Sequence, residues 1–417
     1  MKQENLRGER WCILLLIIFI PFLSIGKTTR VSSTSPKSLQ NAINQCNRGD
    51  TLLVQPGMYK EHDIVINKKL TIIGLQYPVI DGENKSQLVV ITADSVTVMG
   101  LRLQNTGRSS MTDMAGIRVQ NATAALISGN KLQNNTYGIY MQNASNSELR
   151  GNIIEATAKD ELNSGNGIHA WKCHDLLIRN NRISGHRDGI YFEFVTDSHV
   201  KNNLSTKNIR YGLHFMFSHN DAYSGNQFIE NGSGVAVMYS KGVIMLNNTF
   251  RHNWGDAAYA ILLKEISDSR IENNKFIKNT VGLYMEGTSR IQVRCNEFIE
   301  NGWALKVQAS CDNNNFEKNN FIANSFDVAT NGTMMLNTFN GNYWDKYDGY
   351  DMDKNRIGDV PYYPVSVYSV ITEKIPTAMI LYRSFLTNVM DQVEKLMPSI
   401  IPDKLKDDAP KMKRLKL

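Results

Sequence analysis

The stretch NKFIKNTVGLYM, residues 274–285, is followed 22 residues later by NEFIENGWALKV, residues 296–307. The same order of Asn, apolar residue and Gly-aliphatic pair returns through most of the chain. The pairs are Gly116-Ile117, Gly138-Ile139, Gly167-Ile168, Gly189-Ile190, Gly212-Leu213, Gly234-Val235, Ala260-Ile261, Gly282-Leu283 and Ala304-Leu305. Their successive steps are 22, 29, 22, 23, 22, 26, 22 and 22 residues. A period of this kind indicates a repeat architecture.

A second series keeps phase with the first and consists of an Asn ahead of an apolar residue. Its members are Asn130-Lys-Leu132, Asn152-Ile153, Asn181-Arg-Ile183, Asn203-Leu204, Asn226-Gln-Phe228, Asn248-Thr-Phe250, Asn274-Lys-Phe276 and Asn296-Glu-Phe298. One repeat cannot bury its apolar residues alone, but coils stacked on one another form a continuous core. Asn can adopt the left-handed conformation and stack its amide on the Asn of the next coil, and Gly permits positive φ or close approach.

The predicted fold class is therefore all-β: a right-handed parallel β-helix, a solenoid of the pectin-lyase type, with three short strands in each coil. Helical solenoids are disfavoured because their repeats need longer units and helix-forming residues. The long steps predict loops around Ala156 to Ser164 and around Asn253 to Tyr259.

We predict three regions: a signal peptide over 1–26, the β-helix with its N-terminal cap over 27–365, and a C-terminal cap over 366–417 with a basic tail. Residues 39–44 predict a short amphipathic helix ahead of a strand at 51–54, which covers the open end of the coils. A second amphipathic helix is predicted at about 376–397, with Leu381, Phe385, Val389, Val393 and Leu396 on one face. That helix could cap the last coil or face a partner or a membrane surface.

The N-terminus predicts export. A charged stretch, residues 2–10, precedes an apolar run of about 15 residues that Pro21 interrupts, which is short for a membrane span of about 20. A small residue, Gly26, stands where cleavage is expected. Export into an oxidising compartment leaves Cys46, Cys173, Cys295 and Cys311 free to pair or not, and their spacing matches no metal knuckle.

Composition argues against disorder, with 42% hydrophobic and 21% charged residues. The net charge of +6 is partly due to the tail at 411–416, and charges of both signs are interspersed through the repeats. Without a concentrated basic stripe, nucleic acid is not an expected ligand.

Strand alternation allows the outer face to be mapped coil by coil. The aliphatic residue after each Gly points inward, whereas the residues two and four places after Gly point outward. This map puts His214, Met216 and Met238 together on adjacent coils about 4.8 Å apart. Glu193 and His169 lie on the two coils before them.

Thioethers beside an imidazole favour Cu(I), because calcium and magnesium prefer oxygen ligands and zinc prefers more His or Cys. The candidate metal residues are therefore His214, Met216, Met238, Glu193 and His169. The alternative is that the methionines form an adaptable apolar surface for a partner.

Two further chemistries can be weighed. Asp348, Asp351, Asp353 and Asn355 alternate as in a calcium loop, but the Gly and Glu of that motif are missing, so a turn-rich cap is the main alternative. Sugar chemistry needs paired carboxylates, and Glu193 and Glu286 lie four coils apart.

Three segments carry a resemblance to a known family: Arg210-Tyr-Gly-Leu-His-Phe-Met-Phe-Ser218, Gly234-Val-Ala-Val-Met-Tyr-Ser240 and Asn342-Tyr-Trp-Asp-Lys-Tyr-Asp-Gly-Tyr-Asp351. With residues 357–366 and 378–385, they make the chain resemble the NosD family over nearly its whole length. Alginate epimerases, the nearest sugar-processing alternative, carry Asp-Pro-His-Asp where this chain has Leu213-His-Phe-Met216.

The resemblance implies a periplasmic, non-enzymatic accessory protein for nitrous oxide reductase. It implies an ABC permease and its cytoplasmic ATPase subunit as partners, a lipoprotein chaperone as the source of copper, and the apo-reductase as its recipient. Under it, His214, Met216 and Met238 become a relay for transient Cu(I). A polysaccharide lyase, hydrolase or epimerase and a metal-free docking adaptor remain as alternatives.

Overall fold

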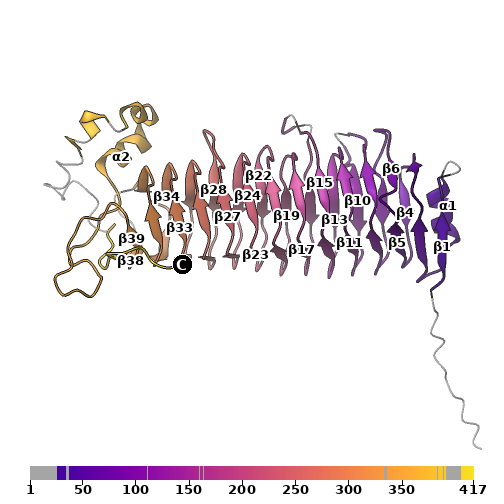
Figure 1. Cartoon of the computed structure of the whole chain (residues 1–417), viewed down its shortest axis with the longest axis horizontal. Coiled ribbons are helices and arrows are strands. Elements are labelled where there is room, and N and C mark those ends of the chain that lie inside the picture. The colour runs from indigo at the N-terminus through magenta and orange to yellow at the C-terminus, as the bar shows by residue number, and fades with distance from the viewer. Residues whose placement is uncertain are drawn as a thin grey trace, which may run out of the picture.

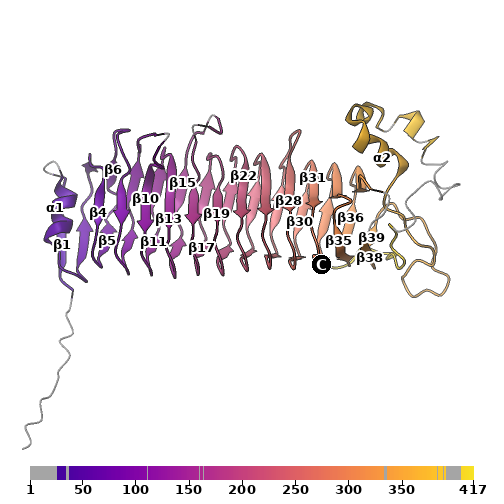
Figure 2. The same cartoon turned by 180° about the vertical axis from the view of Figure 1, so that it is seen from behind.

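The computed structural model describes residues 26–33, 37–109, 111–158, 160–162, 164–332, 336–382, 384–387, 389–390 and 405–417. Its coils stack along the long axis, with a helix at each end (Figures 1 and 2). The described strands form three sheets of 14, 13 and 12 strands, which we call sheets A, B and C. Adjacent strands within each sheet are parallel. The predicted parallel β-helix is confirmed.

Sheet A contains β1 (Thr28–Val31), β2 (Thr51–Val54), β5 (Thr71–Gly74), β8 (Thr97–Met99), β11 (Leu126–Ser128), β14 (Glu148–Arg150), β17 (Leu177–Arg179), β20 (His199–Lys201), β23 (Ala222–Ser224), β26 (Ile244–Leu246), β29 (Arg270–Glu272), β32 (Gln292–Arg294), β35 (Asp312–Glu317) and β38 (Leu336–Asn340). Sheet B contains β3 (Met58–Tyr59), β6 (Val79–Asp81), β9 (Arg102–Gln104), β12 (Lys131–Gln133), β15 (Ile153–Glu155), β18 (Arg182–Ser184), β21 (Leu204–Thr206), β24 (Gln227–Ile229), β27 (Thr249–Arg251), β30 (Lys275–Ile277), β33 (Glu297–Ile299), β36 (Asn320–Ile322) and β39 (Tyr343–Trp344). Sheet C contains β4 (Ile64–Ile66), β7 (Val89–Ile91), β10 (Ala115–Gln120), β13 (Tyr137–Gln142), β16 (Ile168–Trp171), β19 (Ile190–Glu193), β22 (Tyr211–Met216), β25 (Ser233–Met238), β28 (Tyr259–Lys264), β31 (Val281–Glu286), β34 (Trp303–Val307) and β37 (Phe326–Ala329).

Apolar side chains of one column stack along the axis of the solenoid. In sheet B the rings of Phe276 and Phe298 lie 4.5 Å apart and almost parallel, and Phe321 stacks on Trp344 at 4.0 Å. These rings are fully buried. The apolar residue in each Asn-x-apolar motif therefore builds the continuous core that the repeat predicted.

The asparagines of the second series form a buried ladder, which we call the first Asn ladder. Its members are Asn130, Asn152, Asn181, Asn203, Asn226, Asn248, Asn274, Asn296, Asn319 and Asn342. Each side-chain oxygen accepts from the backbone N–H of the preceding member, so corner groups that stacking buries are paired. The residue before each member has positive φ, for example Asn202 at 54° and Gly225 at 65°. The left-handed conformation thus belongs to the preceding residue and not to the ladder asparagine.

The glycines before the strands of sheet C serve close approach. A Cβ added at Gly212 would lie 2.7 Å from the carbonyl oxygen of Gly234 and 2.8 Å from the ring of Phe228. No positive φ is found at this glycine. The repeat therefore selects Gly or Ala here because of space.

The N-terminal cap matches its prediction. Helix α1 (Ser38–Gln45) buries Leu39 and Ile43 against the core, ahead of strand β2. The loop after β15 and the loop before β28 occupy the two places where the repeat step lengthens.

The C-terminal cap differs from the prediction of one helix over 376–397. Helix α2 (Val367–Lys374) comes first, and the 3₁₀ helix η1 (Pro376–Leu381) follows it. Pro376 lacks an N–H and restricts Ile375, whose φ of −132° ends α2. Residues 385–387 and 389–390 are helical, and 391–397 lie outside the described residues.

The basic tail returns onto the last coils. Asp407 is buried and accepts from the backbone N–H groups of Gly341 and Asn342 at 2.9 Å, so it ends the first Asn ladder. Further along, Leu415 pairs with the side chain of Asn320, and Arg414 pairs with Glu297. The tail is therefore part of the cap.

The signal peptide prediction falls almost entirely on residues 1–25, which lie outside the described residues. Among the described residues no helix is both long and apolar enough to cross a membrane.

The first Asn ladder can be tested by Asn226→Ala. The change leaves the N–H of Asn203 and the carbonyl of Val200 without their partners, so we expect a loss of about 3 kcal/mol in the free energy of unfolding. Urea denaturation measures it. Exposed Gln227→Ala, one residue away, should change the free energy by less than about 0.5 kcal/mol. Equal effects of the two changes would contradict a structural role for the ladder.

The buried carboxyl of Asp221 makes the free energy of unfolding depend on pH. Burial raises the pKa of this carboxyl from 3.8 to about 8. Between these values the folded chain binds more protons than the unfolded chain, so the free energy of unfolding falls as pH rises. Asp221→Asn removes this loss, and its advantage should grow by up to about 1.4 kcal/mol per pH unit from pH 5 to 7.

Asp94→Asn is the matched control. Asp94 is exposed and accepts a backbone N–H from Thr123 at 2.8 Å, as Asp221 accepts from Ser198 at 2.8 Å. Thermal unfolding across the pH range should show no growing advantage for Asp94→Asn. A flat profile for Asp221→Asn would contradict the protonated, buried carboxyl.

Candidate metal site and docking surface

The register of sheet C places the candidate metal residues in two outer columns. Tyr191 pairs with His214, while Glu193 pairs with Met216 and Met216 with Met238. The two thioethers therefore stand on neighbouring strands, about 4.8 Å apart between backbones. Both methionines are half-buried.

His214 is only 3% exposed, although it points away from the core. The rings of Tyr191 and Tyr211 flank it, with centroids at 5.0 and 4.9 Å. The imidazole is therefore an outer side chain that its neighbours enclose.

A buried carboxylate and a guanidinium face one nitrogen of that imidazole. Nδ1 of His214 lies 3.0 Å from a terminal nitrogen of Arg210 and 3.6 Å from Oδ2 of Asp188. The fully buried Asp188 pairs with Arg210 at 3.3 Å and accepts from the backbone of Tyr211 at 3.2 Å. Nε2 of His214 has no hydrogen-bond partner among the described residues.

These contacts define two tautomers. If Arg210 donates to Nδ1 of His214, the ring carries its proton on Nε2. If the proton is on Nδ1, facing Asp188, Nε2 presents a lone pair. A carboxylate behind the far nitrogen is the usual arrangement for a metal-binding histidine.

His169 lies apart from this group. Tyr191 separates it from His214, and the ring centroids of His169 and Tyr191 lie 4.9 Å apart. Nδ1 of His169 contacts the Asn166 amide at 3.0 Å. Burial, together with Arg187, lowers the pKa of His169 to about 3. The ring is therefore neutral and packed between tyrosines.

Exposed aromatic rings border the methionines. Phe194, Phe217 and Tyr239 follow Glu193, Met216 and Met238 and stack at 5.3 and 5.0 Å with about 40% of each side chain exposed. We call Phe194, Met216, Phe217, Met238 and Tyr239 the Met-aromatic patch. The equivalent corners on earlier coils hold Asn121 and Asn143, which suit positive φ.

Large rings at positive φ are unfavourable by about 1 kcal/mol each. Because these rings are exposed, their burial offsets little of this conformational cost. They form an exposed aromatic row on three consecutive coils.

The calcium prediction receives no support from the loop that carries it. The carboxylate of Asp351 accepts from the backbone of Asn355 and Arg356, and Asp353 accepts from Asn355. Across the described residues, no group of three or more His, Cys, Asp or Glu side chains is placed to hold a metal. The loop is a turn-rich cap whose oxygens bind its own backbone. Cys46, Cys173, Cys295 and Cys311 are unpaired thiols.

Asp188 and Arg210 were not predicted from the sequence as part of the site. Asp188 directly precedes Gly189, where other coils carry Tyr137, Tyr211 or Val281, whereas Arg210 lies two places before Gly212. Asp188 is the only charged residue directly before one of the Gly-aliphatic pairs, and this is the signal that could have revealed it.

The sugar-chemistry alternative fails on this face. Glu193 and Glu286 are four strands apart in one column, about 19 Å, whereas glycosidases need carboxylates within about 10 Å.

Known proteins resemble this chain in sequence and in fold. Residues 154–349, which include both methionines and His214, match a family model described as "Periplasmic copper-binding protein (NosD)". The chain is thus similar to the NosD family. A "Probable ABC transporter binding protein NosD" of Pseudomonas aeruginosa is 28% identical over 353 residues, covering 80% of this chain and 82% of that relative. A protein of the same description from Stutzerimonas stutzeri is 26% identical over 357 residues, 80% of each chain.

Solved structures share the fold of this chain. PfbA, a surface adhesin of Streptococcus pneumoniae, aligns with a TM-score of 0.55 at 12% identity, over 73% of this chain and 93% of that one. The catalytic unit of an α-1,3-glucanase from Streptomyces thermodiastaticus aligns with a TM-score of 0.58 at 12% identity, over 78% and 66% of the chains. At such identities the likeness concerns the fold alone.

Asp188→Asn tests the buried pair. The amide cannot neutralise Arg210, so the free energy of unfolding should fall by about 2 kcal/mol at pH 7. Urea denaturation measures the change. The matched control is Asp175→Asn, because Asp175 pairs with His174 on the surface and should contribute less than about 1 kcal/mol. Similarly small losses of unfolding free energy in both variants would contradict the role of the Asp188 and Arg210 pair in organising the site.

Proposed function

We propose that this chain is a periplasmic, non-enzymatic accessory protein of an ABC-type transporter. It handles Cu(I) as cargo and helps to assemble the copper centres of nitrous oxide reductase. The description of the family and the names of the two relatives support this class of function. The observation that carries the proposal is the Met216 and Met238 pair on adjacent strands, beside His214 with its unpartnered Nε2.

The donor set suits Cu(I). Two thioethers and one imidazole are soft to intermediate ligands, and no carboxylate except Glu193 stands in the adjacent positions of that column. Because both methionines are half-exposed, cargo can enter and leave by ligand exchange with a partner. We assign the ligand role to His214, Met216 and Met238, with Glu193 at the edge and His169 as a packing residue.

Asp188 and Arg210 tune the imidazole. Arg210 favours the tautomer with the proton on Nε2, which cannot bind a metal, and Asp188 favours the tautomer that can. The two therefore hold His214 between a binding and a non-binding form, which suits transient binding better than storage.

The Met-aromatic patch gives partners a surface that surrounds the ligands. Stacked rings exclude water around the methionines when a second protein covers them. The partners of this proposal are a copper chaperone lipoprotein that supplies Cu(I), the apo-reductase that receives it, and the ABC permease with its cytoplasmic ATPase.

A chelator competition with Cu(I) tests the site. Met216→Leu with Met238→Leu keeps side-chain volume and removes both thioethers, so the affinity should fall by about 100-fold. Met58→Leu with Met352→Leu is the matched control, since both of these methionines are exposed and lie elsewhere. An unchanged titration in the first variant would remove the proposed site and leave the patch as a metal-free docking surface.

A further inference from the structure

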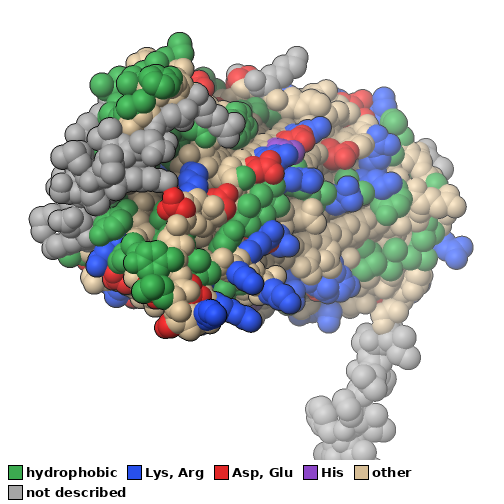
Figure 3. Space-filling view, turned by 60° about the vertical axis from the view of Figure 1, so that its left-hand side comes forward, with side chains coloured by type: hydrophobic (Ala, Val, Ile, Leu, Met, Phe, Trp, Pro, Cys, Tyr) green, Lys and Arg blue, Asp and Glu red, His purple; other side chains and the backbone are tan. Residues whose placement is uncertain are grey.

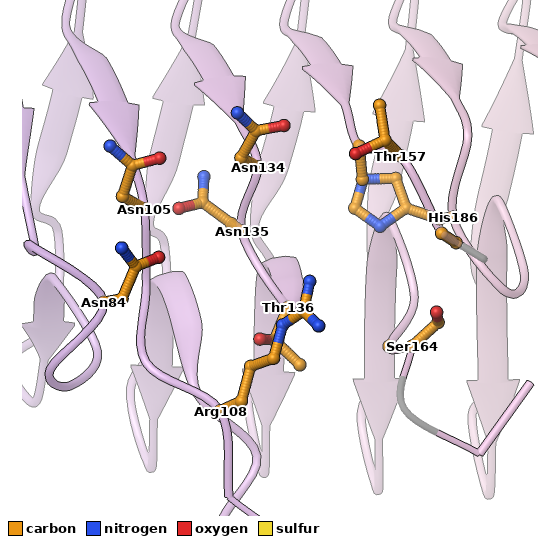
Figure 4. Close-up of a pocket in the computed structure, with 12 residues that line it drawn as sticks. Asn84, Asn105, Arg108, Asn134, Asn135, Thr136, Thr157, Ser164 and His186 are labelled. Carbon is orange, nitrogen blue, oxygen red and sulfur yellow. The ribbon is translucent and has the colours of Figure 1, made fainter. Parts of the chain in front are cut away.

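A second feature, far from the methionines in the sequence, is a cavity of about 260 Å³ where sheet B turns into sheet C. Asn105, Arg108, Asn134, Asn135, Thr157 and His186 line it. Figure 4 shows these side chains coming from successive coils, with Asn105 toward one end and Thr157 and His186 toward the other. No Asp or Glu is among the described residues that line the cavity.

The cavity lies where a second buried ladder is interrupted. Five residues after most members of the first Asn ladder stands another asparagine, and hydrogen bonds link Asn208, Asn231, Asn253, Asn279, Asn301 and Asn324 from coil to coil. On the two coils beside the cavity, Thr157 and His186 hold this position instead. The longer loop after β15 widens the same coil.

Two buried polar atoms at this ladder position lack partners among the described residues: Oδ1 of Asn135 and Nε2 of His186. Asn135 is 3% exposed and His186 is 1% exposed. The amide nitrogen of Asn135 still donates to the carbonyl of Leu103 at 3.0 Å, as ladder asparagines do.

Both atoms are hydrogen-bond acceptors. Burial lowers the pKa of His186 to about 4, and a hydrogen bond from the ring to the Gly165 backbone opposes that shift. The imidazole is therefore neutral at pH 7, with its proton toward Gly165 and a lone pair on Nε2. A buried acceptor without a donor costs about 1–3 kcal/mol.

These acceptors select the chemistry of a ligand. An anion would bring more acceptors to the buried atoms, and an ammonium would find no carboxylate in the lining. Hydroxyl groups donate to Asn135 and His186 and also accept from the amides of Asn105 and Asn134. A volume of about 260 Å³ is suited to one sugar ring.

We propose that this cavity binds one hexose residue of a glycan, with hydroxyl groups that complete the interrupted ladder. Exposed Arg108 at the rim can pair with the carboxylate of a uronic acid. Because the described lining lacks an acid and base pair, the sugar is bound and not cleaved. This site does not depend on copper.

Ligand-observed NMR with maltotriose and with trigalacturonate, each titrated into the full exported chain, tests the proposal. We expect saturable binding of at least one trisaccharide. His186→Asn replaces the acceptor by the residue that other coils carry, so it should fold and weaken binding at least tenfold. His174→Asn, on an exposed histidine, is the matched control and should bind as the native chain does.

Arg108→Ala distinguishes the two sugar types, because it should weaken trigalacturonate and spare maltotriose. Thermal unfolding establishes that each variant is folded, and an unchanged Cu(I) titration of His186→Asn separates this site from the copper proposal. Absence of binding by the native chain, or equal binding by His186→Asn, would overturn the inference and leave a cavity that holds water only.

Discussion

Every coil of this solenoid buries a corner of polypeptide backbone, and those polar groups must be paired within the protein. The first Asn ladder meets this requirement with one side chain per coil, which accepts from the coil before and donates to a carbonyl further back. The same contact fixes the register between coils, because a slipped strand would leave its corner N–H unpaired. Asp407 extends this pairing to the last coil from a distant part of the chain.

Fixed register turns a repeating sequence into columns of side chains. The pairing of Met216 with Met238, and the row of Phe194, Phe217 and Tyr239 beside it, follow from that register and not from any local preference. On the face that Figure 3 shows, charged side chains of both signs are interspersed, and one group of hydrophobic side chains lies at the C-terminal end. There Ile380 and Phe385 are more than four-fifths exposed.

Departures from the repeat mark the places where polar groups are left for other uses. Asp188 introduces a charge directly before a Gly-aliphatic pair, and with Arg210 it contacts Nδ1 of His214. Thr157 and His186 enter the second Asn ladder and open a cavity. In both places a buried nitrogen of a histidine lacks a partner among the described residues.

The sequence by itself determined the parallel β-helix, the alternation of inner and outer side chains and the neighbouring methionines, because coil stacking converts a fixed period directly into spatial adjacency. It also located the two loops and α1. Only the tertiary structure decided that His214 and His169 are enclosed, since tyrosines of neighbouring coils supply that burial. The folded chain also decided the C-terminal cap, where α2 forms ahead of the predicted helix and η1 ends at Leu381 inside it, and the return of Asp407 to the last coil. Contacts between residues more than 60 positions apart, and gaps in a hydrogen-bond ladder, have no local period and become visible only when the coils are stacked.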